Sequence, residues 1–172
     1  MPVDPEALRA VMRHWPTGVA VLTARHAGQV HGMTVNSFTS ISLEPPLVLV
    51  CIERIVRTHA LVEQSRAFAI SFLREGQAWI SDRFAGRNTE NQDRFAGLNT
   101  YTAVTGAPIL ADNLGHLDCV VIAAHPAGDH TIFVAEVASA AEGSAWPTGP
   151  AGHDHAGLSP LLYFDRGYHH LD

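Results

Sequence analysis

Cysteine is scarce in this sequence, and its scarcity argues against a fold held together by disulfides. The chain has two cysteines among 172 residues, whereas small disulfide scaffolds are far richer in them. Cys51 and Cys119 each lie within an apolar run. Buried cysteines behave as small apolar residues, so we expect both to be core residues and neither to be a nucleophile.

Long hydrophobic runs and clusters of positive charge are also missing. No apolar run approaches the ~18 residues that a membrane helix needs, and residues 1–6 have neither the basic nor the apolar region of a signal peptide. The net charge is −6, and the 11 basic residues, all of them arginines, are scattered. Because nucleic acid and anionic membranes are bound by clustered cations, we expect a cytoplasmic protein that binds small molecules or proteins, and neither nucleic acid nor membrane.

Motifs that identify several common catalytic and nucleotide sites are absent. There is no Gly-x-Gly-x-x-Gly after a predicted strand, no Gly-x-x-x-x-Gly-Lys-Ser/Thr, no His-Glu-x-x-His and no Gly-x-Ser-x-Gly. Eleven histidines are present, and the groupings nearest to a metal-binding pattern are His153 with His155 and His169 with His170. Because a zinc site needs three or four converging ligands, we predict no functional metal.

The composition and hydrophobic pattern predict one mainly β domain spanning residues 1–172. Hydrophobic residues make up 47% of the chain and charged residues 16%, as in a globular protein that buries its own core. A helix is predicted from Asp4 to just before Pro16, and the segment 143–157 predicts an exposed loop. Strands are predicted at 19–24, from 30 onward, and at 47–52, 67–73, 114–125, 131–141 and 161–164, with short helices at 58–64 and 76–83. Because no regular long helices separate the strands, an antiparallel Greek-key β-barrel, closed and with short helices at its rims, is favoured over a parallel doubly wound sheet.

The most informative stretch is 32–52, in which a polar segment leads into an apolar run. Six of its first eleven residues carry a hydroxyl or an amide. Pro45 and Pro46 then impose an extended entry into residues 47–52, which we predict to be a buried strand. We interpret the polar segment as a loop that lines a barrel-like core and holds a flat polar ligand.

A flavin is a ligand that this stretch suits, because its ring needs hydrogen-bond partners along one edge and its phosphate needs an anion site. Arg57 and Thr58 lie at a predicted helix N-terminus, where backbone N–H groups and the helix dipole favour an anion. The alternative interpretations are a plain N-cap for Thr58 and a solvated charge for Arg57. The ring partners are Thr34, Asn36, Ser37, Thr39 and Ser40.

Two further segments have both a structural and a ligand-binding interpretation. His130 lies in the turn-forming segment 126–130, where a surface histidine is the commoner case. Phe84 is either a core anchor or, with Ala85 and Gly86 after it, a place where the backbone approaches a ring system closely. The sequence Asp-Arg-Phe-Ala-Gly occurs at 82–86 and again at 93–97, which is too short to be a solenoid repeat.

Seven motifs, in order, resemble the flavin reductase family, whose members are the small reductase components of two-component flavin-dependent monooxygenases. They are PTGVAV at 16–21, GMTVNSFTS at 32–40, PPLVLV at 45–50, RTHA at 57–60, DRFAG at 82–86, GDHTIFV at 128–134 and PLLYF at 160–164. Several ordered motifs are far more specific than any one. The resemblance implies an FMN-binding split β-barrel that works as a homodimer. Such a protein uses NADH or NADPH to reduce FMN or FAD and releases the reduced flavin to a partner monooxygenase.

The resemblance also implies roles for individual residues. His130 is similar to the nicotinamide-side histidine of the family's Gly-Asp-His motif. Arg57 and Thr58 correspond to the phosphate end, although many family members carry a small polar run where this chain has Glu-Arg-Ile-Val at 53–56. The other implied contacts are Thr34, Val35, Asn36, Ser37 and Ser40 with the ring and ribityl chain, Cys51 and Ile52 through the backbone, Phe84, Ala85 and Gly86 at the flank, and Tyr168, which closes the nicotinamide face.

Two other functions fit the same sequence. A flavin-binding electron-transfer protein would retain FMN and be reduced by a protein partner, and an interaction module would leave the barrel empty. Hydride transfer needs no protein acid or base, so no side chain is expected to be indispensable to the chemistry. The choices of FMN or FAD and of NADH or NADPH stay open, because no Rossmann-type discriminating residue is encoded.

Overall fold

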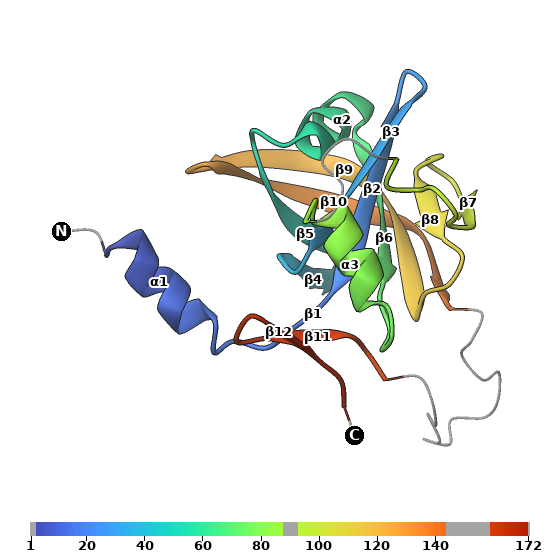
Figure 1. The fold of residues 1–172 in the computed structure, drawn as a ribbon. Coiled ribbons are helices and arrows are strands. Elements are labelled where there is room, and N and C mark those ends of the chain that lie inside the picture. Colours follow the sequence, from blue (N-terminus) through green and yellow to red (C-terminus); the bar gives the residue numbers. More distant parts are fainter. Residues whose placement is uncertain (1–2, 88–92, 144–158, 172) are drawn as a thin grey trace.

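The computed structural model describes residues 3–87, 93–143 and 159–171, and its centre is a seven-stranded antiparallel sheet (Figure 1). The strand order is β3-β2-β6-β9-β10-β5-β4. The predicted mainly β, antiparallel architecture with short helices is confirmed. The strands are β2 (Ala20–His26), β3 (Gln29–Val35), β4 (Phe38–Leu43), β5 (Pro46–Glu53), β6 (Ala67–Phe72), β9 (Gly115–Ala127) and β10 (His130–Glu142).

The barrel is split between β3 and β4. These strands are consecutive in the chain and joined by Asn36 and Ser37, yet they stand at opposite ends of the sheet order. Within the described ranges they share no hydrogen-bonded ladder, so the barrel is not closed in the way that the strand pattern predicts. Because an edge strand keeps unpaired backbone groups, the outer edges of β3 and β4 are free to meet a ligand or another chain.

Strand β2 is buried on both faces, because it separates two hydrophobic cores. Its residues Ala20, Leu22 and Ala24 face the main core inside the sheet, where side chains from β5, β6, β9, β10 and the helix α2 also pack. Val21 faces the other way, into a second core under the helix α3. The second core therefore fixes α3 against the outer face of β2 and its neighbour β3.

Short helices and two small sheets surround the main sheet. Helix α2 (Arg57–Ser65) packs on β2 and β3, and α3 (Ala78–Phe84) also lies against these two strands. None of the helices in the described ranges is long and apolar enough to cross a membrane. The small sheets are β1 (Thr17–Gly18) with β11 (Leu162–Phe164) and β12 (Gly167–His169), and β7 (Thr100–Thr102) with β8 (Pro108–Leu110).

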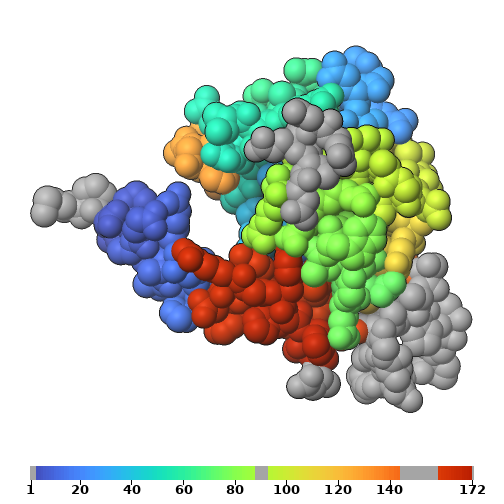
Figure 2. Space-filling model, viewed as in Figure 1, coloured from blue at the N-terminus to red at the C-terminus, as the bar shows by residue number. Residues whose placement is uncertain are grey.

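The N-terminal helix α1 (Pro5–Met12) stands off the barrel (Figures 1 and 2). The helix predicted after Asp4 is confirmed, and the Asp4 side chain caps it by accepting from the backbone N–H of Glu6. None of its residues is buried, and Val11 is 68% exposed. The apolar stripe of this helix therefore has no partner within the described chain.

The central stretch 32–52 differs from the prediction in two ways. It is not one loop, because residues up to Val35 belong to β3 and those from Phe38 belong to β4. Its hydroxyls do not line the barrel interior, since Thr39 and Ser40 are exposed on the edge strand β4. Strand β5 is buried on one face only, with buried and half-buried residues alternating from Leu47. The residue types predict strands here, but they do not say that β4 is an edge.

The two cysteines are free thiols. Cys119 is fully buried in the main core, as predicted, and burial raises its pKa to about 12. Cys51 is half-buried on β5. The predicted loop at 143–157 and His153 and His155 lie outside the described residues, except for Gly143, which is buried.

Candidate functional site

A pocket of about 200 Å³ lies where β3, α3 and β12 meet. It collects five of the residues implied by the sequence from three separate parts of the chain. Its volume is below the ~300–1,000 Å³ of pockets that enclose a whole ligand, so this pocket by itself holds only part of a ligand of that size. The lining residues implied by the sequence are Thr34, Val35, Asn36, Ala85 and Tyr168, and the others are Val19, Ser81, Arg87 and Tyr163.

Hydrogen bonds hold the walls of this pocket together. The Thr34 hydroxyl on β3 donates to the backbone carbonyl of Ser81 on α3. The Tyr168 hydroxyl on β12 donates to Asp82 Oδ1 at 2.8 Å and lies 2.9 Å from Ser81 Oγ. Arg87 pairs with the same Asp82 oxygen at 3.0 Å. Burial raises the pKa of Tyr168, so its hydroxyl is neutral and links β12 to the Asp82–Arg87 ion pair at the pocket wall.

Phe84 lies beneath the pocket as a core anchor and does not line it. It is fully buried in the second core, and its ring packs edge-on against Phe95, with centroids 5.2 Å apart. On β3, a Cβ added to Gly32 would lie 2.7 Å from Phe84 Cε1. Gly32 therefore lets β3 approach α3, while Gly86, at φ +75°, turns the chain away after the helix.

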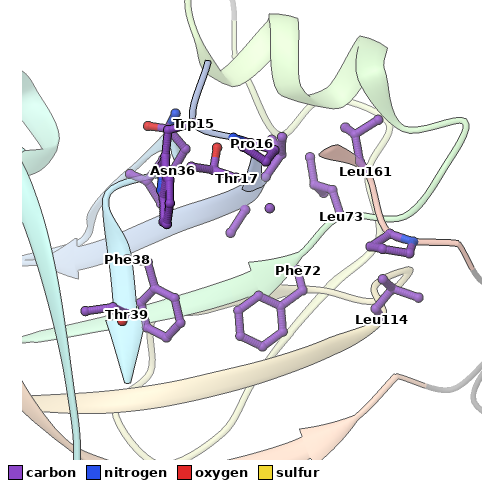
Figure 3. A pocket seen from close by; sticks show the side chains of 15 residues that line it. Trp15, Pro16, Thr17, Asn36, Phe38, Thr39, Phe72, Leu73, Leu114 and Leu161 are labelled. Atoms are coloured by element: carbon purple, nitrogen blue, oxygen red, sulfur yellow. The ribbon is translucent and has the colours of Figure 1, made fainter. Parts of the chain in front are cut away.

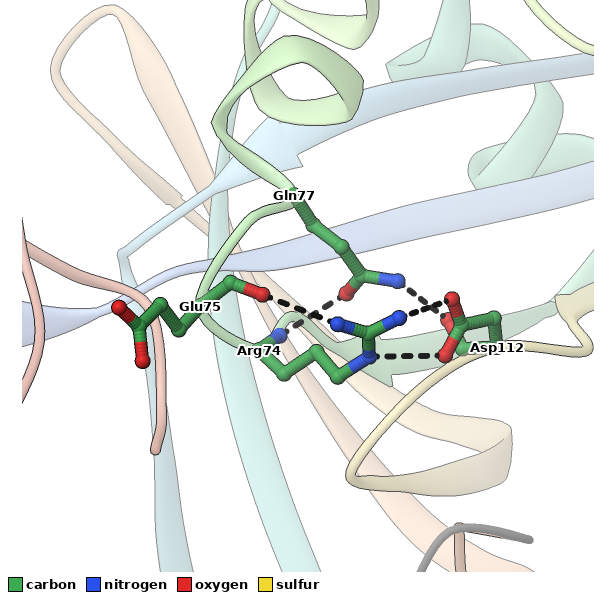
Figure 4. A network of polar contacts seen from close by, with 4 residues as sticks. All are labelled: Arg74, Glu75, Gln77 and Asp112. Carbon is green, nitrogen blue, oxygen red and sulfur yellow. Dashed lines mark hydrogen bonds and ion pairs between the residues drawn. The ribbon is translucent and has the colours of Figure 1, made fainter. Parts of the chain in front are cut away.

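The start of α3 is held by a polar network on its far side (Figure 4). Arg74 makes a two-point contact with Asp112, at 2.9 Å from Nε and 2.7 Å from Nη2. Gln77 accepts from the Arg74 backbone N–H and donates to the Asp112 carbonyl, each at 2.9 Å. The Arg74 guanidinium holds the pKa of the Asp112 carboxyl below its usual range. This network fixes α3 relative to the segment between β8 and β9.

Cationic groups gather at the other end of β3. Thr58 is fully buried, and its Oγ1 lies 2.7 Å from His31 Nδ1. The N-cap of α2 is Val56, with no side-chain capping bond, so the N-cap interpretation of Thr58 is wrong: the helix begins at Arg57, two residues earlier than a cap at Thr58 requires. Arg57 is exposed, and its Nη2 reaches Gln29 Oε1 at 3.4 Å.

Arg94 and His31 lie beside Arg57 and Thr58, and neither was predicted from the sequence to be a site residue. Arg94 Nη1 donates to the carbonyls of Gly32 at 2.9 Å and Phe84 at 2.7 Å. Burial, followed by Arg94 and then Arg57, lowers the pKa of His31 to about 4. The available signal was the second Asp-Arg-Phe-Ala-Gly segment, which folds back on the first and places Arg94 at the outer edge of β3.

The connection between β3 and β4 is tied to β5. Ser37 Oγ donates to the Cys51 carbonyl at 2.7 Å, and the Cys51 N–H donates to the Ser37 carbonyl at 3.1 Å. Burial raises the pKa of Cys51, and the Ile52 side chain is fully buried. Ser40 is exposed on β4 and does not line the pocket. The structure thus pairs Ser37 with Cys51, and neither of them lines the pocket.

His130 lies apart from this pocket, at the start of β10 and opposite Glu53 on β5. Its side chain is 42% exposed, and Nδ1 lies 2.7 Å from Asp129 Oδ1. The hydrogen bond from His130 lowers the pKa of Asp129. A neighbouring cleft of about 630 Å³ runs between the hairpin and α2, lined by Glu53, His59 and other residues. In a single chain His130 therefore has the surface position that its residue type predicts.

A second, mostly apolar pocket of about 620 Å³ adjoins the first (Figure 3). It lies between the segment after α1, the β4 edge and β6, and it shares Val19, Val35 and Asn36 with the smaller pocket. Trp15 and Phe38 form part of its lining. No group of three or more His, Cys, Asp or Glu side chains that could hold a metal occurs in the described ranges.

The described chain is a split antiparallel barrel, with the 200 Å³ pocket (the ring pocket) beside one end of the edge strand β3 and the guanidinium groups of Arg57 and Arg94 (the cationic cluster) nearer the other. Residues 12–172 match a protein-family model described as "Flavin reductase like domain". The chain therefore belongs to the flavin reductase-like family, as its motifs predict.

Individual relatives agree with the family model. The reductase component of 4-nitrophenol 4-monooxygenase/4-nitrocatechol 2-monooxygenase from Rhodococcus opacus is 38% identical over 146 residues, covering 85% of this chain and 77% of the relative. The reductase subunit HsaB of a flavin-dependent monooxygenase from Mycobacterium tuberculosis is 34% identical over 161 residues, covering 92% and 84%. Among solved structures, the NADH:FAD oxidoreductase of Streptomyces globisporus in complex with NAD and FAD fragments superposes with a TM-score of 0.83 at 32% identity, covering 100% of this chain and 97% of that one.

Proposed function

We propose that this protein is an NAD(P)H-dependent flavin reductase that supplies reduced FMN or FAD to a separate flavin-dependent monooxygenase. The observation that carries the proposal is the family match over residues 12–172, together with relatives that are reductase components of such monooxygenases. The chain acts as one flavin reductase-like domain. The cytoplasm is the compartment we propose, because it supplies the nicotinamide cofactor and keeps free thiols such as Cys51 and Cys119 reduced.

The residues present fit a flavin, because the ring pocket and the cationic cluster lie along one strand. Thr34 is three residues from His31, which corresponds to about 10 Å of extended chain, a separation that a ribityl chain bridges. The Gly32 carbonyl points to the outer edge of β3, where Arg94 binds it. By the two-residue period of a strand, the backbone groups of Thr34 also face this edge and can pair with the polar side of a ring.

In this arrangement the chain binds the flavin, orients its ring and shields it from water. A bound flavin supplies a hydride acceptor, and the transfer needs no protein acid or base. Thr34 and Asn36 orient the ring, while Tyr168 covers one side of the pocket and reduces access of water. Arg57 and Arg94 bind the phosphate group as a pair of cations. Of the remaining implied residues, Val35 and Ala85 contact the ring, and Phe84 and Gly86 support the pocket. Ser37, Cys51 and Ile52 act through their backbone groups. Thr58 acts through His31, and Ser40 acts at the interface between two copies of the chain.

The test of this proposal is a coupled measurement of turnover and binding. Purified protein is mixed with NADH or NADPH and free FMN or FAD, and the nicotinamide absorbance is followed. A reductase consumes many equivalents of the nicotinamide per protein molecule, whichever flavin it prefers. Retained yellow flavin without turnover would contradict the proposal and identify an electron carrier instead. No flavin binding at all would point to an interaction module.

His130 is proposed to contact the nicotinamide, and His130→Ala is the corresponding variant. We expect the KM for NADH to rise about tenfold, as for the loss of one hydrogen bond to a polar group, with little change in the KM for flavin. His125→Ala is the control, because His125 is exposed further along the same hairpin. Steady-state parameters equal to those of the unaltered enzyme would remove His130 from the site.

A homodimer is also part of the proposal, since a single chain leaves the ring pocket small and two apolar surfaces uncovered. These surfaces are the stripe on α1 and the 620 Å³ pocket beside it, with Ile41 and Leu43 exposed on the neighbouring edge strand β4. A second copy that packs here would cover them and enlarge the site. Its contact with β4 would also place Ser40 at the interface.

The variant Val11→Asp tests the dimer. We expect its dimer dissociation constant, measured by analytical ultracentrifugation, to rise at least about tenfold, because a charge would be buried in an apolar contact. Val104→Asp is a matched control, since Val11 and Val104 are 68% and 69% exposed in one chain. Equal dissociation constants for the two variants would place the interface elsewhere.

A further inference from the structure

His31 belongs to β3, and the guanidinium groups of two arginines from other parts of the chain contact this strand on either side of it. Arg57 reaches β3 at Gln29, two residues before His31, and Arg94 reaches it at the carbonyl of Gly32, the residue after. On the side of α2, His31 Nδ1 is 2.7 Å from the hydroxyl of the fully buried Thr58. The imidazole is therefore held at a fixed position by α2, with a cation on either side of it along the strand.

This environment keeps the imidazole neutral. Burial contributes most to the lowered pKa of His31, followed by Arg94 and then Arg57. On the adjacent strand β2, the direct partner of His31 is the uncharged Ala24, and His26 lies two positions further along. The charged groups that act on His31 are thus the two arginines, both of which disfavour a third positive charge.

We propose that His31 is a phosphate-binding residue that takes up one proton from solvent when the phosphate group of a flavin nucleotide binds between Arg57 and Arg94. This rests on the proposed flavin site. An anion at this place offsets the two guanidinium charges, so that the protonated imidazole becomes the favoured form. The only bond formed is an N–H bond on the imidazole, with the proton taken from solvent, and Nδ1–H then donates to the Thr58 hydroxyl.

The direction of the pH dependence follows from linkage. The pKa of His31 is about 4 in the empty site and is higher with an anion bound. Between these two values binding takes up a proton, so affinity rises as the pH falls and stops rising below about pH 4. We expect FAD to bind about 3- to 10-fold more tightly at pH 5.5 than at pH 7.5. FAD is the suitable probe because its phosphate groups stay ionised throughout this range.

The experiment is calorimetric titration of the full chain with FAD at pH 6.0, in two buffers with different heats of ionisation, which counts the protons bound. We expect an uptake of about half a proton or more, and much less with riboflavin, which has no phosphate. His31→Gln keeps a hydrogen-bonding side chain beside Thr58 but cannot titrate, and it should abolish the uptake. His125→Gln, at an exposed position on β9, should retain it.

The outcomes separate this inference from the function on which it rests. FAD binding with no proton uptake, or with the same uptake in His31→Gln, overturns the role of His31 and leaves the flavin site intact. If neither FAD nor riboflavin binds, the flavin site itself is wrong and the role of His31 with it. Uptake that is lost in His31→Gln and kept in His125→Gln supports the proposal.

Discussion

Replacing Gly32 by alanine is expected to destabilise the protein by about 1–3 kcal/mol, the usual cost of overpacking a core. The added Cβ would lie 2.7 Å from Phe84 Cε1 and 3.1 Å from the Leu22 carbonyl oxygen. Phe84 is fully buried and cannot retreat without moving α3. Because the ring pocket lies between β3 and α3, flavin affinity should fall together with stability. Urea unfolding and flavin titration measure the two effects.

Two further variants make this prediction specific. Gly18→Ala is the control, because a Cβ at Gly18 meets no atom within 4 Å, and we expect it to be nearly neutral. Adding Phe84→Leu to Gly32→Ala removes the ring that the new methyl group meets. The double variant should be more stable than the sum of the two single changes indicates. If the changes in unfolding free energy of the two single variants simply add up in the double variant, Gly32 and Phe84 are not coupled through this contact.

The sequence predicts most of the sheet because local patterns specify strands and turns. In the turn between β2 and β3, Gly28 has a φ of 78°, a conformation that glycine adopts without strain, whereas the φ of 47° at Ala27 is not one that its residue type predicts. Asp4 caps α1 as its residue type predicts. By contrast, the exposure of Ser40 depends on β4 being an edge strand. No local pattern carries that information, because strand order is set by contacts across the whole sheet.

The same contrast between local patterns and long-range contacts applies to the candidate site. Thr34, Val35 and Asn36 are consecutive, so a motif places them together wherever β3 lies. Arg94 reaches the same site from 62 residues away, through a contact with the Gly32 carbonyl. Its position depends on how the chain returns after α3, which residue spacing does not encode. Thr58 shows a related limit: a threonine at a predicted helix start suggests a cap, but the helix begins at Arg57 and Thr58 turns inward to His31.

Arg94 is expected to have the largest effect on phosphate recognition. Arg94→Met keeps an apolar stem of similar length and removes both the charge and the bonds to the Gly32 and Phe84 carbonyls. A hydrogen bond to a charged group contributes about 1.5–3 kcal/mol, so the dissociation constant for FMN should rise about 10- to 150-fold. Riboflavin, which lacks the phosphate, should be affected much less.

The short internal repeat provides the matched control for this variant. Arg83 holds the position in the first Asp-Arg-Phe-Ala-Gly segment that Arg94 holds in the second. It also donates to a backbone carbonyl, that of Ala96 at 2.8 Å, but it is stacked over Trp79 on the outside of α3. Arg83→Met should therefore leave the ratio of FMN to riboflavin affinity unchanged, whereas Arg94→Met should reduce it. Equal losses for both ligands in Arg94→Met would mean that Arg94 only braces β3 against α3, and the cation facing the phosphate would then be Arg57 alone.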